Sequence, residues 1–294
     1  MIADVDRDFD LDTYVANDTT ENFLYLNNGS GQFEETALIN GAAGDDSGAP
    51  NGSMGVDVGD FNGDGRFDLW VANYVEEPFA LYRNMGGGLF QHVSRSTGIN
   101  VLGGLYVGFG TGFADLDRDG DEDLVVANGH VFEHPATAPI HQLPLLLRND
   151  DGHYTVLKFS PNKYFSTPHL GRGLALGDLD HDGDIDVAVS HLQAPVAVIR
   201  NDDSNSKRWL QLRLIGRTVS RTPIGATATL HTSRGDMVRT VIGGGSYLSH
   251  NDCHLAWGIP ADAQVRHLTI AWPDGSMQRI DAIETEQVMI CVQP

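Results

Sequence analysis

Four short acidic segments carry the side chains whose types and spacing point most directly to chemistry. Each is a nine-residue loop with carboxylate or amide side chains at positions 1, 3, 5 and 9, while position 7 can offer its main-chain carbonyl. Alternate side chains turned inward can surround a cation, and calcium takes roughly six to eight hard oxygen ligands in a forgiving geometry. The spacing therefore predicts a cofactor of up to four Ca²⁺ ions, one in each of loops 1 to 4. The candidate metal-binding residues are Asp4, Asp6, Asp8, Asp10 and Asp12; Asp60, Asn62, Asp64, Arg66 and Asp68; Asp115, Asp117, Asp119, Asp121 and Asp123; and Asp178, Asp180, Asp182, Asp184 and Asp186.

Position 6 of the loops supports a sharp turn. Gly65, Gly120 and Gly183 occupy it in loops 2 to 4, and glycine accepts the positive φ that such a turn favours. Phe9 occupies the same position in loop 1 and breaks the rule. The side chain at position 7, such as that of Arg66, is expected to be irrelevant to binding, because only the carbonyl there is used.

Three other interpretations of the loops are weaker. The EF-hand begins with the same pattern but needs a glutamate at position 12 and helices on both sides. Isolated acidic turns would not recur in register four times, and crowded carboxylates without a cation should open or acquire raised pKa values. Ligated carboxylates are also not free to act as a general acid or base. The EF-hand interpretation fails because position 12 is a valine in an apolar run in all four loops: Val15, Val71, Val126 and Val189.

The loops belong to a repeat whose first aspartates are 56, 55 and 63 residues apart. In the second copy, short apolar runs at 54–59 and 69–72 flank the loop, and further runs follow at 80–83 and 89–93. Short runs of this kind between glycine, asparagine and aspartate clusters are typical of antiparallel strands joined by tight turns. The period suits a four-stranded propeller blade. The third copy carries an insertion at 129–143, rich in His and Pro, which is expected to be a long surface loop.

The pattern changes after residue 201. Residues 202–206 have the composition of a linker, and no acidic loop occurs after them. The remainder predicts a small β-sandwich. We therefore expect an all-β protein with two domains, a partial β-propeller of about four blades at 1–205 and a sandwich at 206–294. The predicted strands of the sandwich include 210–214, 227–231, 265–271 and 287–291.

Composition excludes some classes of partner. The 294 residues include 40 acidic and 19 basic side chains, for a formal charge of −21, which disfavours nucleic acid as a partner. No apolar run reaches the roughly 18 residues that a membrane span needs, so none is expected. The sequence starts without a basic and apolar leader, which suggests either a cytoplasmic protein or a start that is not the natural one. Cys253 and Cys291 could form one disulfide or remain two free thiols.

Both halves resemble known families. The acidic repeats resemble FG-GAP or VCBS repeats, as found in integrin α-subunit propellers, and Phe109–Phe113 before loop 3 fits that name. Together with the C-terminal half they resemble the cartilage acidic protein family and its bacterial relatives, a likeness that Ala127–Val131 also fits. Phe9 and Cys253 are departures from the pattern. The C-terminal half is similar to the ASPIC/UnbV domain through Ile224–Ala226, Gly243–Ser249, His254–Gly258 and Ala271–Gly275.

The resemblance implies a calcium-binding protein that is extracellular, periplasmic or attached to the cell surface, often associated with adhesion or extracellular matrix. It also implies a propeller of about seven blades, of which this chain would be a fragment. Met1 lies only three residues before loop 1. On this interpretation the first blade lacks its innermost strand, and the open arc exposes a strand edge that favours aggregation.

Histidines offer a second kind of metal chemistry. The two candidate groups lie in the insertion and near the C-terminus, but their surroundings are typical of loops, and zinc needs four placed ligands or three plus water. No G-x-S-x-G elbow or phosphate-binding loop motif is present. The candidate residues are His130, His134 and His141, and His250, Cys253 and His254.

Two hypotheses for function remain. The first is a non-enzymatic scaffold for binding or adhesion, with an extracellular protein or glycan as partner. The second is an enzyme, or an accessory protein of a biosynthetic pathway, with its active site on a propeller face or in the insertion. A turnover assay discriminates between them, and so does a pocket with convergent polar groups that are not metal ligands.

Overall fold

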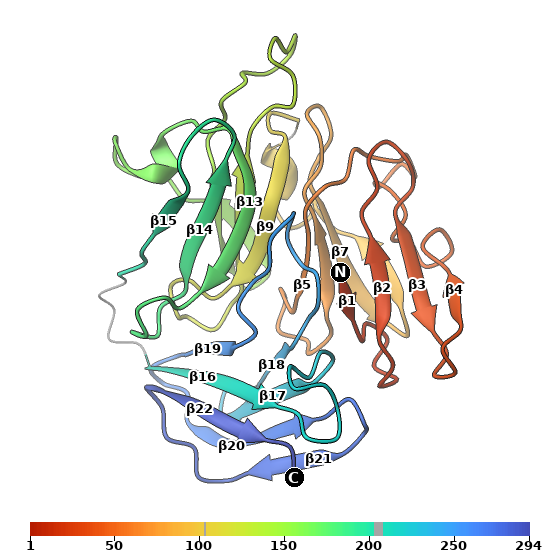
Figure 1. Cartoon of the computed structure of the whole chain (residues 1–294), viewed down its shortest axis with the longest axis vertical. Helices are drawn as coiled ribbons and strands as arrows, with labels where there is room; N and C mark the ends of the chain where they lie inside the picture. Colours follow the sequence, from red (N-terminus) through yellow and green to blue (C-terminus); the bar gives the residue numbers. More distant parts are fainter. Residues whose placement is uncertain (103, 203–207) are drawn as a thin grey trace.

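Strands dominate the computed structural model, which describes residues 1–102, 104–202 and 208–294. Four antiparallel sheets, here called blades 1 to 4, stand side by side in an arc (Figure 1). Within each blade the strand order follows the chain. The blades are β1 (Ile2–Ala3), β2 (Asp12–Val15), β3 (Phe23–Asn27) and β4 (Phe33–Glu35); β5 (Val56–Gly59), β6 (Asp68–Val71), β7 (Ala80–Gly86) and β8 (Leu89–His92); β9 (Gly108–Ala114), β10 (Asp123–Asn128), β11 (Leu145–Asp150) and β12 (His153–Val156); and β13 (Gly171–Gly177), β14 (Asp186–His191) and β15 (Ala197–Ile199).

The core lies between the blades. Along β6, Leu69 and Val71 pack against blade 1, whereas Trp70 packs against blade 3. Successive side chains of a strand point to opposite faces, so a blade with a neighbour on each side is apolar on both faces. The indole N–H of Trp70 donates to Thr111 Oγ1 at 2.7 Å, which gives its polar atom a partner inside the core. The predicted all-β, propeller-like fold is confirmed.

One detail of the prediction is wrong. Blade 1 does not lack its innermost strand, because residues 2 and 3 form β1, in which Ile2 pairs with Thr13 and Ala3 with Asp12. Two residues suffice because Met1 also contributes, its carbonyl accepting the main-chain N–H of Tyr14 at 3.0 Å. Short 3₁₀ turns at Ile99–Leu102 (η1) and Tyr164–Ser166 (η2) are the helical elements of the described chain. Within that part, no helix is long and apolar enough to cross a membrane.

The C-terminal strands form the expected sandwich. Its core contains Leu210, Trp257, Leu268 and Trp272, all essentially buried. β16 (Arg208–Ile215) and β22 (Gln287–Val292) are parallel, whereas the other strand pairs of the sandwich are antiparallel. The predicted boundary at 205/206 falls among residues 203–207, outside the described residues, and stays a prediction. One sheet is ordered β19 (Leu255–Ile259), β16 (Arg208–Ile215), β22 (Gln287–Val292), and the other β18 (Asp236–Thr240), β17 (Thr227–Thr232), β20 (Val265–Ala271), β21 (Met277–Ile280).

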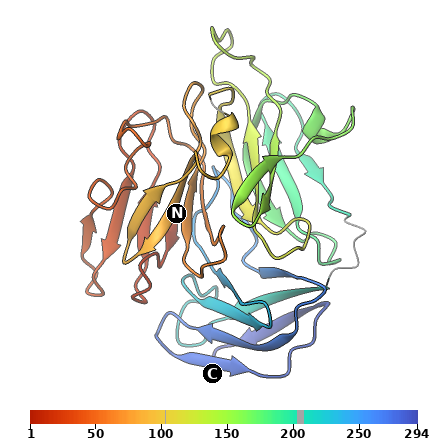
Figure 2. The same ribbon diagram turned by 180° about the vertical axis from the view of Figure 1, so that it is seen from behind.

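The connection between β18 and β19, residues 241–254, leaves the sandwich and runs along the inner strands of the blades (Figures 1 and 2). Gly243 exchanges main-chain hydrogen bonds with Ile2 of blade 1 at 2.6 and 2.9 Å. Ser246 donates its N–H to Val56 of blade 2 at 2.7 Å, and Asn251 accepts the N–H of Leu176 of blade 4 at 3.0 Å. This central connector therefore covers parts of the inner strands of blades 1, 2 and 4.

Candidate metal sites

The four acidic loops share one backbone arrangement. Each connects the first two strands of its blade, and the aspartate at position 1 accepts the main-chain N–H groups of positions 5 and 6 at 2.9–3.2 Å. Position 6 has positive φ in all four loops, 82° at Gly65 and 74° at Phe9. Position 4 is also left-handed: φ is 66° at Gly63, and the non-glycine residues Arg7 and Arg118 have similar values of 68° and 56°. The sequence gives no sign of this second left-handed position, because it is glycine in loop 2 alone.

The aspartate at position 9 closes each loop. In loop 2, Asp68 Oδ2 accepts the N–H of Phe61 at 3.3 Å, and its Oδ1 accepts the N–H of Asn84 at 2.7 Å. The same two bonds recur in the other loops, where position 9 joins position 2 to an asparagine at the end of the third strand. These asparagines are Asn27, Asn84, Asn149 and Asn201.

Three of these asparagines also latch neighbouring blades together. The side-chain amide of Asn84 in blade 2 donates to the carbonyl of Val5 in loop 1 at 2.7 Å. Asn149 donates in the same way to Phe61 in loop 2 at 2.8 Å, and Asn201 donates to Leu116 in loop 3 at 2.7 Å. This role was not predicted from the sequence. Its signal was visible, since each of these asparagines ends the third apolar run of its repeat.

The carboxylates converge in loops 1, 3 and 4. In each of these loops, three aspartates place one oxygen each within 4.8 Å of the others. In loop 1, Asp6 Oδ1 is buried without a hydrogen-bond partner, as expected for a ligand atom. Asp202, after the repeat, joins a further group with Asp180 and Asp182. The converging sets are Asp4, Asp6 and Asp8; Asp115, Asp117 and Asp119; and Asp178, Asp180 and Asp186.

Loop 2 has a different charge balance. It carries Asn62 in place of one aspartate, and Asp64 Oδ2 is held by two arginines, Arg66 at 2.6 Å and Arg83 at 3.0 Å. The Arg66 Nε–H also donates to the carbonyl of Asn84 at 2.8 Å. The expectation that the Arg66 side chain is irrelevant is therefore revised, because this side chain joins the loop to β7.

The remaining side chains at position 7 also have partners outside the converging sets, or lie at the surface. Asp121 accepts the main-chain N–H of Asp151 at 3.0 Å. Asp184 forms a buried ion pair with Arg118 of loop 3 at 2.8 Å, which joins loops 3 and 4. Asp10 lies half-buried in loop 1 beside Gly29. Ligation by the carbonyls of this position stays a prediction.

Burial and mutual repulsion leave the loop carboxylates reluctant to ionise. Burial raises the pKa of Asp68 and of Asp123 to about 8, and neighbouring aspartates add to the rise. It raises the pKa of Asp12 and of Asp115 to about 7. A divalent cation favours the charged form of such groups. The donors are all oxygen, which suits calcium rather than zinc, so the residues present fit this ion.

Loops 3 and 4 also contact the C-terminal sandwich. The main-chain N–H of Gly258 in β19 donates to Asp115 Oδ2 at 2.9 Å, and the amide of Gln211 in β16 donates to Asp178 Oδ2 at 2.8 Å. A Cβ atom on Gly183 would lie 2.2 Å from the Trp209 ring, so loop 4 packs directly on the sandwich. The candidate metal sites of loops 3 and 4 therefore lie where the blades meet the second domain.

Two family models match the chain. The FG-GAP-like repeat model matches residues 4–71 and 60–126, and the ASPIC and UnbV model matches residues 216–294. The chain is therefore an FG-GAP-like repeat protein with a C-terminal ASPIC and UnbV domain, as its motifs predicted.

Curated relatives agree with this assignment. The chain is 28% identical to Cartilage acidic protein 1 of Mus musculus over 281 residues, covering 90% of this chain and 40% of that protein. The Homo sapiens protein of the same name is 27% identical over 278 residues, with 90% and 39% covered. The chain thus spans about 40% of the length of these relatives.

Likeness to solved structures is weak. An Agrocybe aegerita lectin, described as recognising non-reducing terminal N-acetylglucosamine, has a TM-score of 0.38 and 22% identity, covering 69% of this chain and 52% of the lectin. The V. cholerae biofilm matrix protein Bap1 has a TM-score of 0.36 and 11% identity, covering 97% of this chain and 49% of that chain.

Proposed function

We propose that this chain is a calcium-stiffened, non-enzymatic scaffold that works outside the cytoplasm and presents its loops to a protein or glycan partner. The observation that carries the proposal is the convergence of three carboxylates in each of loops 1, 3 and 4. Four loops with one backbone arrangement are typical of a repeated structural element rather than of a single reaction centre. The ligands would be the aspartates and Asn62 at positions 1, 3, 5 and 9, with the main-chain carbonyl at position 7.

Bound calcium supplies positive charge to the loops. The chain itself transmits this stabilisation, because the aspartate at position 9 holds the latch asparagine, and that asparagine holds the neighbouring blade. At position 1, Asp115 and Asp178 hold the sandwich. Ordered loops therefore fix the angles between neighbouring blades and the position of the second domain.

An extracytoplasmic location follows from the proposed ion. Calcium is a common ligand of extracellular modules, which bind it at roughly 10⁻⁴ to 10⁻³ M. Similarity to cartilage acidic protein points in the same direction.

The insertion is the proposed contact surface for the partner. It projects beyond the blades (Figure 1) and exposes Phe132, at 62% of its surface, together with Val131. Its base is fixed: His130 is buried against the rings of Tyr74 and Phe132, and Gln142 exchanges main-chain bonds with His169. His130 is thus an anchor of the loop rather than an exposed recognition residue.

The test combines calorimetry with a deletion. Calcium titration should reveal up to four sites, and a variant in which residues 132–139 are replaced by a short glycine linker should keep them. The same variant should lose capture on arrays of glycans and secreted proteins, and Phe132→Ser should lose part of it. Capture that survives both changes removes the insertion from the proposal.

Enzymatic activity is the alternative that the same experiment addresses. If a reproducible turnover is found and one substitution outside the acidic loops, such as His254→Gln, abolishes it, the scaffold proposal fails. Calcium binding without any turnover on the substrates tried, together with partner capture by the insertion, supports the scaffold.

A further inference from the structure

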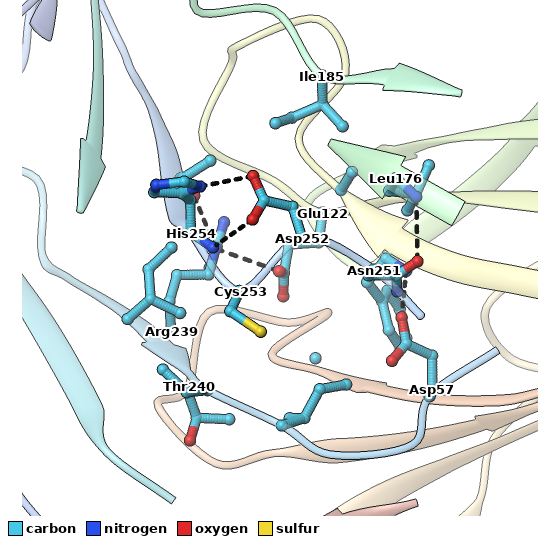
Figure 3. A pocket seen from close by; sticks show the side chains of 18 of the residues that line it. Asp57, Glu122, Leu176, Ile185, Arg239, Thr240, Asn251, Asp252, Cys253 and His254 are labelled. Carbon is cyan, nitrogen blue, oxygen red and sulfur yellow. Dashed lines mark hydrogen bonds and ion pairs between the residues drawn. The ribbon is translucent and has the colours of Figure 1, made fainter. Parts of the chain in front are cut away.

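A cavity of about 120 Å³ lies where the central connector passes between the blades and the sandwich. Figure 3 shows its walls, with Asp57 from β5 and Cys253 from the connector facing the same space. It is smaller than a cavity of roughly 150 Å³ that admits benzene, so it accepts an ion or a very small group. Asp60, Asp115 and Asp178, the first aspartates of loops 2 to 4, also line it, but Asp57 and the connector residues are not ligands of the acidic loops.

Two carboxylates in this cavity break the repeat. Asp57 lies three residues before the first aspartate of loop 2, where the other blades have Met1, Gly112 and Ala175. It is only 2% exposed; Oδ2 accepts the N–H of Phe113 at 2.9 Å, whereas Oδ1 has no hydrogen-bond partner. Repeat architecture does not require this residue, so its unpaired buried oxygen calls for a local explanation.

The second carboxylate is the contrasting case. Glu122 stands at position 8 of loop 3, where the other loops have Leu11, Phe67 and Ile185. It forms a buried ion pair with Arg239 at 3.1 Å and accepts the N–H of Asp60 at 2.7 Å. Glu122 is therefore satisfied within the protein, whereas Asp57 keeps one buried oxygen, Oδ1, without a hydrogen-bond partner.

A thiol and an imidazole line the same cavity. His250 Nε2 lies 3.4 Å from Cys253 Sγ, and both belong to one short segment of the connector. Zinc lies about 2.3 Å from a thiolate and about 2.0–2.1 Å from an imidazole nitrogen, so two ligands at a tetrahedral angle are separated by roughly 3.6 Å. The observed separation already matches two neighbouring ligands of one ion.

A second imidazole is oriented by a carboxylate. His254 Nδ1 lies 2.5 Å from Asp252 Oδ2. Histidines that bind metals commonly use one ring nitrogen for such a bond and the other for the ion. This pairing leaves Nε2 of His254 for coordination, and it occurs one residue after Cys253.

We propose that His250, Cys253 and His254 form a site for a thiophilic divalent metal of the zinc class, with the Asp57 carboxylate as its anionic wall. The pair of Cys253 and His250 is preformed, whereas the third ligand must move, because no three carboxylate, imidazole or thiol atoms of this segment lie within 4.8 Å of one another in the described structure. Binding therefore closes residues 250–254 around the ion.

The mixed sulfur and nitrogen donors separate this site from the acidic loops. Sulfur and imidazole favour zinc and related ions, whereas the oxygen donors of the loops favour calcium. Zinc binds the thiolate form of cysteine, so the Cys253 thiol must lose its proton on coordination. Coordination replaces that proton, which passes to the buffer.

The experiment uses cobalt as a probe in the full, reduced chain with calcium already saturating. One equivalent of Co²⁺ should produce a thiolate-to-cobalt charge-transfer band in the near ultraviolet, and Zn²⁺ should abolish it. Cys253→Ser should eliminate the band, and the matched control Cys291→Ser, which changes the buried cysteine of the sandwich, should keep it. Asp252→Asn should weaken the affinity by roughly 10- to 100-fold.

The proposal is overturned if wild-type protein gives no charge-transfer band, or if Cys253→Ser retains it. A measurement on unmodified protein guards against a variant that does not fold. Zinc should slow the alkylation of Cys253 by iodoacetamide in the native chain. An alkylation rate that zinc leaves unchanged also overturns the proposal.

Discussion

Loops 2 and 3 have the same spacing and backbone but different charge balance. In loop 3, Asp117 and Asp119 converge with the first aspartate, and three negative charges crowd together. In loop 2, an asparagine replaces one aspartate, and Asp64 is paired with Arg66 and Arg83. Loop 3 therefore gathers more carboxylate ligands than loop 2, whose Asp64 already pairs with two arginines.

Repeat position therefore fixes geometry but not affinity. Every loop forms the bonds at positions 1 and 9, because these hold the blade together. Calcium affinity rises with the number of charged ligands, and loop 3 has aspartate at positions 1, 3, 5 and 9, whereas loop 2 has Asn62 at position 3. We therefore expect graded calcium affinity, with loop 3 tighter than loop 2.

Chelation should have the largest effect on stability. A site that binds only the folded state, at a hundred times its Kd, adds roughly 2.7 kcal/mol to the free energy of unfolding. Differential scanning calorimetry with excess chelator should therefore show a large fall in Tm. A melting curve that chelator does not change, together with no bound calcium by elemental analysis, would contradict the calcium assignment for all four loops.

The chelated protein should also lose stability as pH rises from about 4 to 8. Asp68 and Asp123 have folded-state pKa values of about 8, raised by burial from 3.8, so the folded state binds more protons than the unfolded state in that window. Each tenfold difference in proton affinity between the two states corresponds to about 1.4 kcal/mol. Urea denaturation across this range measures the slope, and saturating calcium should flatten it. If the chelated protein instead became more stable as pH rises, the prediction would be wrong.

Single substitutions separate the two loops. Asp117→Ala should remove one calcium from loop 3 and cost about 2.7 kcal/mol at the same saturation. Asp64→Ala should remove the site of loop 2 at a smaller cost, because a weaker site contributes less at a given calcium concentration. Calorimetric titration of both variants gives the stoichiometry and the lost affinity. Equal losses would remove the difference that the comparison predicts.

The sequence predicted the repeated part of the molecule well. The period of the acidic loops placed the blades, and the expected runs at 69–72 and 265–271 match β6 and β20 closely. These features are local, since loop spacing and alternation of apolar residues lie within a few residues of one another. The family resemblance added the order of the two domains.

The contacts that join distant segments were not predictable from one sequence. Arg83 lies 19 residues from Asp64, and Gly258 lies 143 residues from Asp115. No local sequence pattern predicts contacts between residues so far apart. The central connector places Gly243 beside Ile2 for the same reason, because tertiary packing rather than propensity decides it. Asp57 could have been noticed as a break in the repeat, but its burial could not.

Removing one arginine should make loop 2 resemble loop 3. Arg83→Gln should raise the calcium affinity of loop 2, because the guanidinium no longer competes with the cation for Asp64. The pair is partly exposed, with side-chain exposures of 40% and 20%, so the gain is about 1 kcal/mol or less. Arg95→Gln, at an exposed arginine outside the loops, is the matched control. A gain that high salt does not reduce would argue against an electrostatic cause.

The smallest expected effect concerns the turn at position 6. Phe9 has φ of 74°, a left-handed conformation that costs an ordinary residue roughly 1–2 kcal/mol, whereas Gly120 occupies the same position in loop 3 without that cost. Phe9→Gly relieves this strain but adds flexibility to the unfolded chain, which offsets about 0.5–1 kcal/mol, so the net gain is about 1 kcal/mol or less. The reciprocal change Gly120→Ala should destabilise loop 3, because its Cβ would also lie 3.2 Å from Met237 Cε. Thermal melts of both variants at saturating calcium test the pair. Opposite signs would identify position 6 as a shared turn, and a loss in both would mean that Phe9 contributes packing that outweighs its strain.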